Sequence, residues 1–171
     1  TGTLISGNLS VGETVQVMPS GLEGKVRNLQ VYGRSVEKAV AGERTAVNLQ
    51  GIETSAVERG DALIRPNTLR ATQLIDAYLE YLPHAPRPLK HRAKQRFHVG
   101  TTLTGASVFL LDREELAPGQ AGFVQLRLDQ PVVALPQDRF VIRGSSAIQT
   151  MGGGVILDAH PDKHKRFAPP V

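Results

Sequence analysis

The sequence contains no cysteine and no tryptophan, and aromatic residues make up only 5% of its 171 residues. The absence of cysteine excludes disulfide bonds, thiolate metal sites and a cysteine nucleophile. No run of 18 apolar residues occurs, and the first residues lack the basic and apolar segments of an export signal. We therefore expect a cytoplasmic protein with no membrane partner, whose core consists mainly of valine, leucine, isoleucine and alanine.

An initiating methionine is also missing, and the chain starts within a segment that alternates like a strand. We therefore expect this chain to be the excised part of a longer protein. Its length accommodates one ordinary domain or two small ones. With 40% hydrophobic and 21% charged residues, the composition is that of a globular chain rather than a disordered one.

Short runs of alternating apolar residues, separated by glycine or proline turns, recur along the chain, as in antiparallel sandwiches and barrels. The predicted strands are 3–5, 14–18, 24–31, 44–49 and 62–64 in the first part, and 72–82, 90–99, 106–111, 121–128, 139–143 and 153–157 in the second. Proline and turn residues in Arg65–Thr68 interrupt the pattern. We predict an all-β protein of two small antiparallel β-barrels in tandem, residues 1–68 and 69–160, followed by a linker, 161–171, to a missing region.

The segment Gln73–Leu82 fits two secondary structures. Its apolar residues also satisfy the i, i+3, i+4, i+7 spacing of an amphipathic helix: Leu74, Ile75, Tyr78, Leu79 and Leu82. Because the neighbouring segments are predicted strands, we interpret this one as a strand as well.

Positive charge is concentrated in one stretch of a chain whose formal net charge is +4. No acid occurs between Glu80 and Asp112, and strand alternation over Lys90–Val99 would place five side chains on one face: Lys90, Arg92, Lys94, Arg96 and His98. Such a row can neutralise successive phosphates of a nucleic acid. The alternative is a solvated strand face whose cations only keep an edge soluble. We favour nucleic-acid binding.

Two motifs that suggest catalysis are weak. The glycines Gly152–Gly154 lack the following Gly-Lys-Ser/Thr and the helix that a phosphate loop needs, so we interpret them as a close backbone approach. Ser145 and Ser146 lack the pattern of a nucleophile elbow and a placed base. No catalytic residue is predicted.

A metal site is conceivable in the tail, because Asp158, His160, Asp162 and His164 carry suitable ligand types. The spacing has little specificity, and the segment contains prolines without a predicted scaffold. No metal site is predicted.

Six motifs in order resemble translational GTPases. VGETVQV around Gly12, AGERTAVNLQGI from Ala41 and VERGDALIRP around Gly60 resemble the second domain of that superfamily, a small β-barrel. RFHVGT from Arg96, PVVALPQDRFVIR from Pro131 and GGGVILDAHP from Gly152 resemble the third domain of the selenocysteine-specific elongation factors. Elongation factor Tu is similar in layout but has Arg-Glu-Gly-Gly where this chain has Arg-Gly-Ser-Ser. The resemblance covers nearly the whole chain, and it also implies a strand at 73–82.

The resemblance implies that the acceptor end of a tRNA lies against the first barrel and the T-stem backbone against the second. By position, Arg96 and the turn residues Arg143, Gly144, Ser145 and Ser146 match T-stem contacts. From charge and the predicted strand face alone, Lys90, Arg92, Lys94 and His98 are candidate additions.

Arg44 matches a position that helps line the selenocysteine pocket in this family. A selenol is more acidic than a thiol and is anionic at neutral pH. A guanidinium that stays charged would therefore prefer it to the neutral hydroxyl of serine. The alternative is an arginine at the rim of a surface turn.

The family implies GTP-dependent delivery of selenocysteinyl-tRNA to the ribosome. The GTP- and magnesium-binding motifs, the first strand of the first barrel and the C-terminal region that binds the mRNA hairpin are not in this chain. We therefore expect no enzyme activity and no cofactor here, with the GTPase domain of the same protein as a partner. One alternative is a structural or protein-interaction barrel pair of another factor, similar to elongation factor Tu or initiation factor 2. A stand-alone hydrolase is the third possibility.

Overall fold

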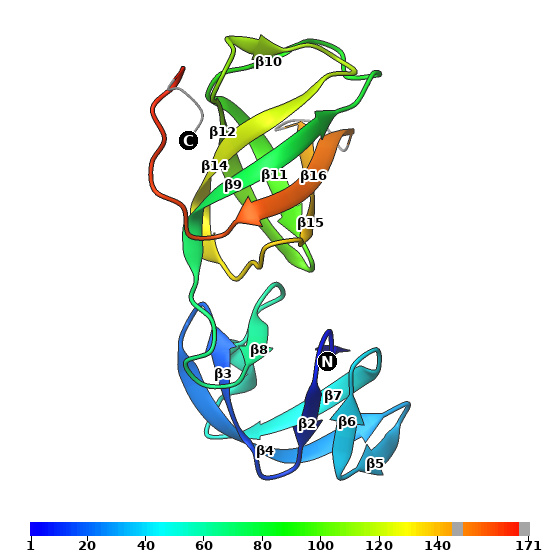
Figure 1. The fold of residues 1–171 in the computed structure, drawn as a ribbon. Coiled ribbons are helices and arrows are strands. Elements are labelled where there is room, and N and C mark those ends of the chain that lie inside the picture. Colours follow the sequence, from blue (N-terminus) through cyan, green and yellow to red (C-terminus); the bar gives the residue numbers. More distant parts are fainter. Residues whose placement is uncertain (145–148, 168–171) are drawn as a thin grey trace. The chain divides into compact units, whose positions relative to one another are not determined.

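The computed structural model describes residues 1–144 and 149–167, and strands make up nearly all of its regular structure (Figure 1). The chain divides into two compact units, Thr1–Arg70 and Ala71–Val171, while the sequence places the boundary near residue 68. The one helical element in the described residues is a 3-10 turn, Thr54–Ala56. Within this described part, no helix has the length and apolar character needed to span a bilayer. The predicted all-β class is confirmed.

The first unit is a curled antiparallel sheet. Its strands are β1 (Gly2–Thr3), β2 (Asn8–Ser10), β3 (Thr14–Met18), β4 (Leu22–Val31), β5 (Arg34–Val36), β6 (Lys38–Val40), β7 (Arg44–Gln50) and β8 (Ala62–Ile64). The main sheet has the order β1-β7-β4-β3-β8, β5 pairs with β4, and β2 and β6 form a separate ladder. The sheet curls around Val15, Val26, Leu29 and Val31. The main sheet ends at β1 and β8, so its ladder is open.

The second unit is a closed barrel. Its strands are β9 (Thr72–Tyr81), β10 (Leu89–Lys90), β11 (Ala93–Val99), β12 (Thr102–Leu110), β13 (Glu115–Leu116), β14 (Ala121–Val132), β15 (Arg139–Gly144) and β16 (Thr150–Asp158). The ring has the order β11-β12-β14-β9-β16-β15, and β10 pairs only with β13. Inward side chains of every ring strand, among them Ile75, Phe97, Leu126 and Ile142, fill the interior.

The segment with two possible structures is a strand. In β9 the inward residues Ile75, Ala77, Leu79 and Tyr81 are all buried, which is the period of two of a strand rather than the spacing of a helix. Neighbours β14 and β16 pair with β9 along its length, so tertiary pairing decides between the two patterns.

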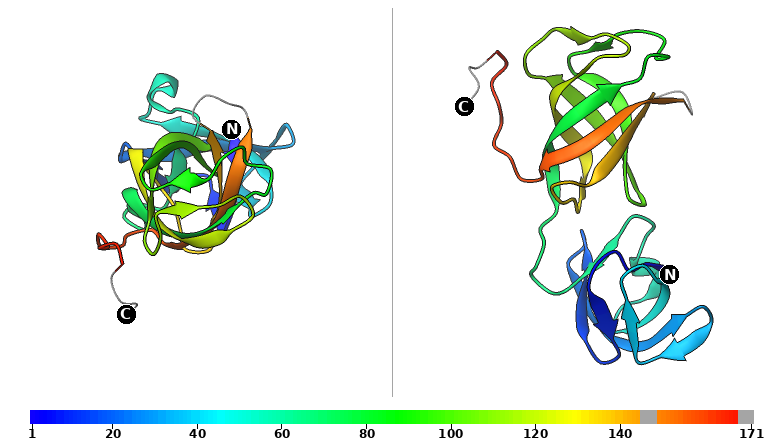
Figure 2. Two further views of the ribbon diagram at one scale, coloured as in Figure 1. Left: turned by 90° about the horizontal axis from the view of Figure 1, so that it is seen from above. Right: turned by 45° about the vertical axis from the view of Figure 1, so that its right-hand side comes forward.

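The three consecutive glycines lie in β16, where the ring closes against β9; both ribbon views show β16, in orange, beside β9 (Figure 1 and Figure 2). A Cβ atom at Gly154 would lie 1.9 Å from the carbonyl oxygen of Tyr78, and one at Gly152 would lie 2.6 Å from that of Glu80. These are contacts with backbone atoms, which cannot move aside without disturbing the ladder. The structure therefore supports the interpretation of a close backbone approach.

The prediction of one continuous strand over Lys90–Val99 is wrong. Lys90 ends the short strand β10, whereas β11 begins at Ala93. Between them Arg92 has a φ of 64°, a left-handed conformation that a strand does not contain. Its backbone N–H donates to the carbonyl of Val108 at 2.7 Å, which fixes this turn on β12. The basic row is therefore continuous only within β11.

Residues 161–167, which the sequence assigns to a linker, are hydrogen bonded to the barrel. The side-chain amide of Gln125 donates to the carbonyl of Asp162 at 2.9 Å. Further along, Arg166 donates to the carbonyl of Leu110, and the N–H of Phe167 donates to that of Leu111 at 2.8 Å. This segment therefore runs against the barrel wall.

Candidate nucleic-acid interface

The barrel of the second unit carries its charges unevenly. In the three adjacent strands β12, β11 and β15, all of whose residues the structure describes, the charged residues are the cations Lys94, Arg96, Arg139 and Arg143. The remaining ring strands β14, β9 and β16 contain Arg127 and the carboxylates Asp76, Glu80, Asp129 and Asp158. One wall of the barrel is therefore positively charged and the opposite wall mostly negatively charged.

Arg96 and Arg143 are directly opposite each other at the centre of the positive wall. They come from distant parts of the sequence, and the antiparallel register of β11 and β15 pairs them. Within β11, Lys94 and Arg96 are exposed while Phe97 and Val99 are buried, as the alternation predicts. Like charges at opposed positions destabilise a sheet, and neither arginine has a carboxylate partner among the described residues. The arrangement is suited to an external anion.

Arg143 also has an unsatisfied donor. Its side chain is half-buried, and its Nε is buried without a hydrogen-bond partner in the described part of the chain. A buried guanidinium donor without an acceptor is costly, which adds to the cost of the opposed charges.

His98 lies on the same face but is electrically different from its neighbours. Burial lowers its pKa most, and the charges of Arg143 and Arg96 lower it further. Near neutral pH the imidazole is therefore mainly uncharged. The sequence predicts His98 as part of a basic row, whereas its half-buried ring adds little positive charge to the surface.

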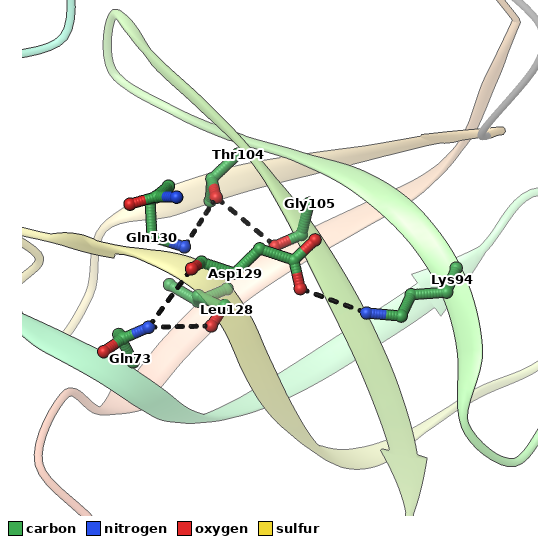
Figure 3. Close-up of polar contacts among 7 residues, drawn as sticks. All are labelled: Gln73, Lys94, Thr104, Gly105, Leu128, Asp129 and Gln130. Atoms are coloured by element: carbon green, nitrogen blue, oxygen red, sulfur yellow. Dashed lines mark hydrogen bonds and ion pairs between the residues drawn. The ribbon is translucent and has the colours of Figure 1, made fainter.

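Lys94 is neutralised in part by an acid that the strand pattern does not reveal. Its Nζ lies 3.0 Å from the Oδ1 of Asp129, which belongs to β14 and not to a neighbour of β11 (Figure 3). The carboxylate reaches across β12 at Gly105, where a Cβ atom would lie 2.1 Å from its Oδ2. Gly105 is also the cross-strand partner of Arg96. Asp129 therefore lies beside the opposed arginines.

The backbone around Asp129 is held in place by polar side chains. β14 has an irregularity in its pairing with β9 between Arg127 and Val132. There Gln73 donates to the carbonyls of Leu128 and Asp129, both at 3.3 Å, and the N–H of Gln130 donates to Thr104 Oγ1 at 3.1 Å (Figure 3). These contacts fix the point from which the carboxylate extends.

Of the other predicted contacts of the second unit, Gly144 adjoins the arginine pair, and the rest are separated from it or cannot be placed. Lys90 is exposed in β10, opposite Glu115 of β13, and Arg92 is exposed in the turn that follows. Gly144 ends β15 opposite Gln95. The predicted contacts Ser145 and Ser146 lie outside the described residues.

Arg44 is exposed at the first position of β7, opposite Thr3 of β1. The preceding Glu43 directs its carboxylate to the N–H of Val40, at 2.9 Å, which closes the turn between β6 and β7. Within the described residues Arg44 forms no ion pair with an acid. Its guanidinium is therefore open to a ligand from solvent.

The side chains once considered as metal ligands have separate partners. The Asp158 carboxylate accepts from the backbone of His160, and His164 pairs with Asp76 of β9. Among residues 1–144 and 149–167, no group of three or more His, Asp or Glu side chains could hold a metal ion.

Both parts of the chain match known protein families. Residues 77–163 match the beta-barrel domain of selenocysteine-specific elongation factors, and residues 1–64 match domain 2 of elongation factor Tu. The first of these matches spans half of the chain.

Two curated relatives are named selenocysteine-specific elongation factor. The one from Desulfomicrobium baculatum is 43% identical over 168 residues, which are 98% of this chain and 26% of the relative. The one from Haemophilus influenzae is 24% identical over 168 residues, 97% of this chain and 26% of the relative. The chain therefore spans about a quarter of the length of the curated relatives it matches.

A solved structure, that of translation elongation factor SelB from Methanococcus maripaludis in its apo form, has the same fold. The TM-score is 0.76 at 24% identity, and the match covers 91% of this chain and 38% of that one. At this identity the likeness supports the fold.

Proposed function

The chain belongs to the selenocysteine-specific translation elongation factors, and we propose that it is the part that holds selenocysteinyl-tRNA for GTP-dependent delivery to the ribosome. In this proposal the second unit contacts the phosphate backbone of the T stem through Arg96 and Arg143. The observation that carries it is the direct opposition of these two arginines, neither of which forms an ion pair with an acid of the described residues. RNA phosphates would supply the missing counter-charge.

The remaining cations act around this pair. We propose that Lys94 joins when phosphate displaces Asp129, and that the turn residues 144–146 approach the backbone of the RNA. His98 would serve as a neutral hydrogen-bonding group rather than as a cation, because its pKa is lowered by burial and by the two arginines.

Arg44 is proposed to recognise the amino acid. Its exposed guanidinium on β7 has no acid partner among the described residues, so an anionic selenolate could approach it. The tRNA body and the aminoacyl group would thus be recognised by different units.

Catalysis and the remaining partners belong elsewhere in the full-length factor. We propose that GTP and magnesium bind its GTPase domain, that its C-terminal region binds the mRNA hairpin, and that the factor acts in the cytoplasm. The competing hypothesis is that the two units only dock the GTPase domain or another protein, as structural barrels of a factor without selenocysteine specificity.

The decisive experiment replaces the opposed arginines in the full-length factor. Affinity for labelled serylated selenocysteine tRNA would be measured at several salt concentrations for Arg96→Gln combined with Arg143→Gln. Each lost phosphate contact should lower the slope of log affinity against log salt by about 0.7 to 0.9. The double variant should therefore lose about 1.5 units of slope and at least about a hundredfold in affinity.

Arg139→Gln is the matched control, since it removes the same charge from the other end of β15. It should change affinity only slightly. If the double variant binds tRNA as tightly as the control does, the docking hypothesis is favoured and the proposed RNA contact is wrong. The urea midpoint of the second unit should be equal in all variants, which checks that the barrel is folded, and equal GTP binding checks the GTPase domain.

A further inference from the structure

A second group of arginines surrounds one aromatic ring on the outer face of β12. The guanidinium carbon of Arg127 lies 4.7 Å from the centroid of the Phe109 ring, and that of Arg92 lies 5.7 Å from it. The ring of His91 contacts the same phenyl ring edge-on at 5.3 Å. We propose that Arg92 and Arg127, held on Phe109, form a second phosphate site that extends the RNA surface from β11 across β12 onto β14. This inference rests on the proposed function.

The strand register explains how these side chains meet. Ser107 of β12 is paired with Lys94 of β11 on one side and with Arg127 of β14 on the other. Phe109 is the next residue of β12 on that outer face, opposite Gln125 of β14. A continuous surface therefore leads from Lys94 over Ser107 to Arg127.

The turn between β10 and β11 brings Arg92 to the same place. Its left-handed backbone and the hydrogen bond from its N–H to Val108 fix the turn one residue before Phe109 in the register. Continued by one residue, the register of β11 and β12 also places Arg92 opposite Phe109. Arg92 therefore contacts Phe109 from the turn that precedes β11.

Carboxylates on the adjoining elements have other partners. Asp129 pairs with Lys94, and Asp76 accepts from Gln125 at 2.8 Å and pairs with His164. Glu114 pairs with Arg166 at 3.0 Å. In the described part of the chain, neither Arg92 nor Arg127 belongs to an ion pair. Their charge is therefore available to an external anion.

Contact with the Phe109 ring leaves the N–H groups of the two arginines available to a phosphate. When a guanidinium lies over a phenyl ring, the ring contacts only the flat face of the guanidinium. Its N–H groups point outward in the guanidinium plane and can still donate to a phosphate. Contact with the ring restricts the two side chains, so they lose less entropy when they bind a phosphate than free side chains would. His91 adds no repulsion at neutral pH, because burial, Arg166 and Arg92 lower its pKa.

The site is distinct from the opposed arginines. Arg92 and Arg127 both lie against the Phe109 ring of β12, whereas Arg96 and Arg143 face each other on β11 and β15. The ligand class is the same in both places, a phosphodiester of the RNA backbone. The RNA would thus cross the barrel wall from β15 toward β14.

The test uses the full-length factor and serylated selenocysteine tRNA over a series of salt concentrations. Arg127→Gln and Arg92→Gln should each weaken binding about fivefold to tenfold and lower the salt slope by about one. Glutamine has a Cβ atom as arginine does, so Arg92→Gln should not change how readily the turn adopts its left-handed backbone conformation. Phe109→Leu keeps both charges, so it should weaken binding about threefold with the slope unchanged.

Arg139→Gln again serves as the control for net charge. If Arg127→Gln and Arg92→Gln bind like Arg139→Gln while the Arg96 and Arg143 double variant loses binding, the second site is wrong and the proposed function stands. If the double variant also binds normally, both proposals are overturned. Because Arg127 and Arg92 are exposed, their variants are informative even where Phe109→Leu impairs folding.

Discussion

Both units are built from antiparallel strands, but only the strands of the second unit form a closed barrel. In the second unit every ring strand pairs on both sides, whereas the main sheet of the first ends at the short strands β1 and β8. Thr1–Arg70 contains eight cations and seven carboxylates, and the rest of the chain contains twelve and nine, which together give the 20 and 16 of the sequence. The net charge is small in both units, so they differ mainly in where their charged residues lie.

Closure determines where that charge can act. Arg96 and Arg143 lie on strands that are each held from both sides, and so their opposition is imposed by the ring. Arg44 lies next to β1, an edge strand of two residues. We therefore expect the arginine pair of the second unit to be held more rigidly than Arg44 of the first. Three predictions test this contrast, beginning with the largest effect.

The first prediction compares one glycine in each unit. Gly154→Ala places a Cβ atom 1.9 Å from a backbone oxygen, so β9 and β16 must separate, and we expect about 3 kcal/mol of destabilisation. Gly24→Ala in β4 meets the Ile52 side chain at 2.8 Å, which can rotate away, and the backbone oxygen of Gln50 at 3.1 Å, which needs only a small shift. Its cost should be about 1 kcal/mol or less.

Urea denaturation, monitored through the methyl NMR signals of each unit, would measure the loss of stability in the two units separately. We expect Gly154→Ala to lower the stability of the second unit alone, and by more than Gly24→Ala lowers that of the first. That result would show that the closed ring tolerates an added Cβ atom less well than the open sheet. Equal costs for the two glycines would contradict the importance that we give to closure.

The strand pattern predicts the clearly alternating strands well and misses several short ladders. Strands 14–18 and 62–64 have the predicted bounds, because their alternation is clear and turns flank them. The hairpin from β4 to β5 was not predicted. Its two-residue loop, Tyr32-Gly33, has φ values of 50° and 76°, and a tyrosine does not signal the left-handed position as asparagine does. Short strand pairs joined by such loops are difficult to predict from the alternation of apolar residues.

Only part of the candidate site follows from the sequence. The outward direction of Lys94 and Arg96 is predicted by alternation, and Arg143 is indicated by the family resemblance. Asp129 is not predictable in this way, because its contact with Lys94 crosses an entire strand and requires a glycine at 105. The uncharged character of His98 likewise depends on burial and on a partner from another strand. These properties arise from the pairing of strands that are distant in the sequence.

The second prediction separates the tasks of the units. In the full-length factor, Arg44→Ala should weaken binding of selenocysteinyl-tRNA about tenfold and of the serylated form about twofold, because only the selenolate is charged. Since no phosphate contact is lost, the salt slope should stay unchanged. Arg59→Ala removes another exposed arginine of the same unit and should affect both tRNAs equally. Equal losses for both tRNAs in Arg44→Ala would exclude the pocket role.

The third prediction concerns the acid that offsets the positive wall. Phosphate binding by Lys94 must break its pair with Asp129, and because the two side chains are 63% and 51% exposed the pair is weak. Asp129→Asn should therefore raise affinity for tRNA by about twofold to fivefold, with little change in stability. Glu80→Gln removes the same charge from the opposite wall and should have less effect. A loss of affinity in Asp129→Asn would instead mean that the carboxylate positions Lys94 for the RNA, so that pre-organisation outweighs the charge it removes.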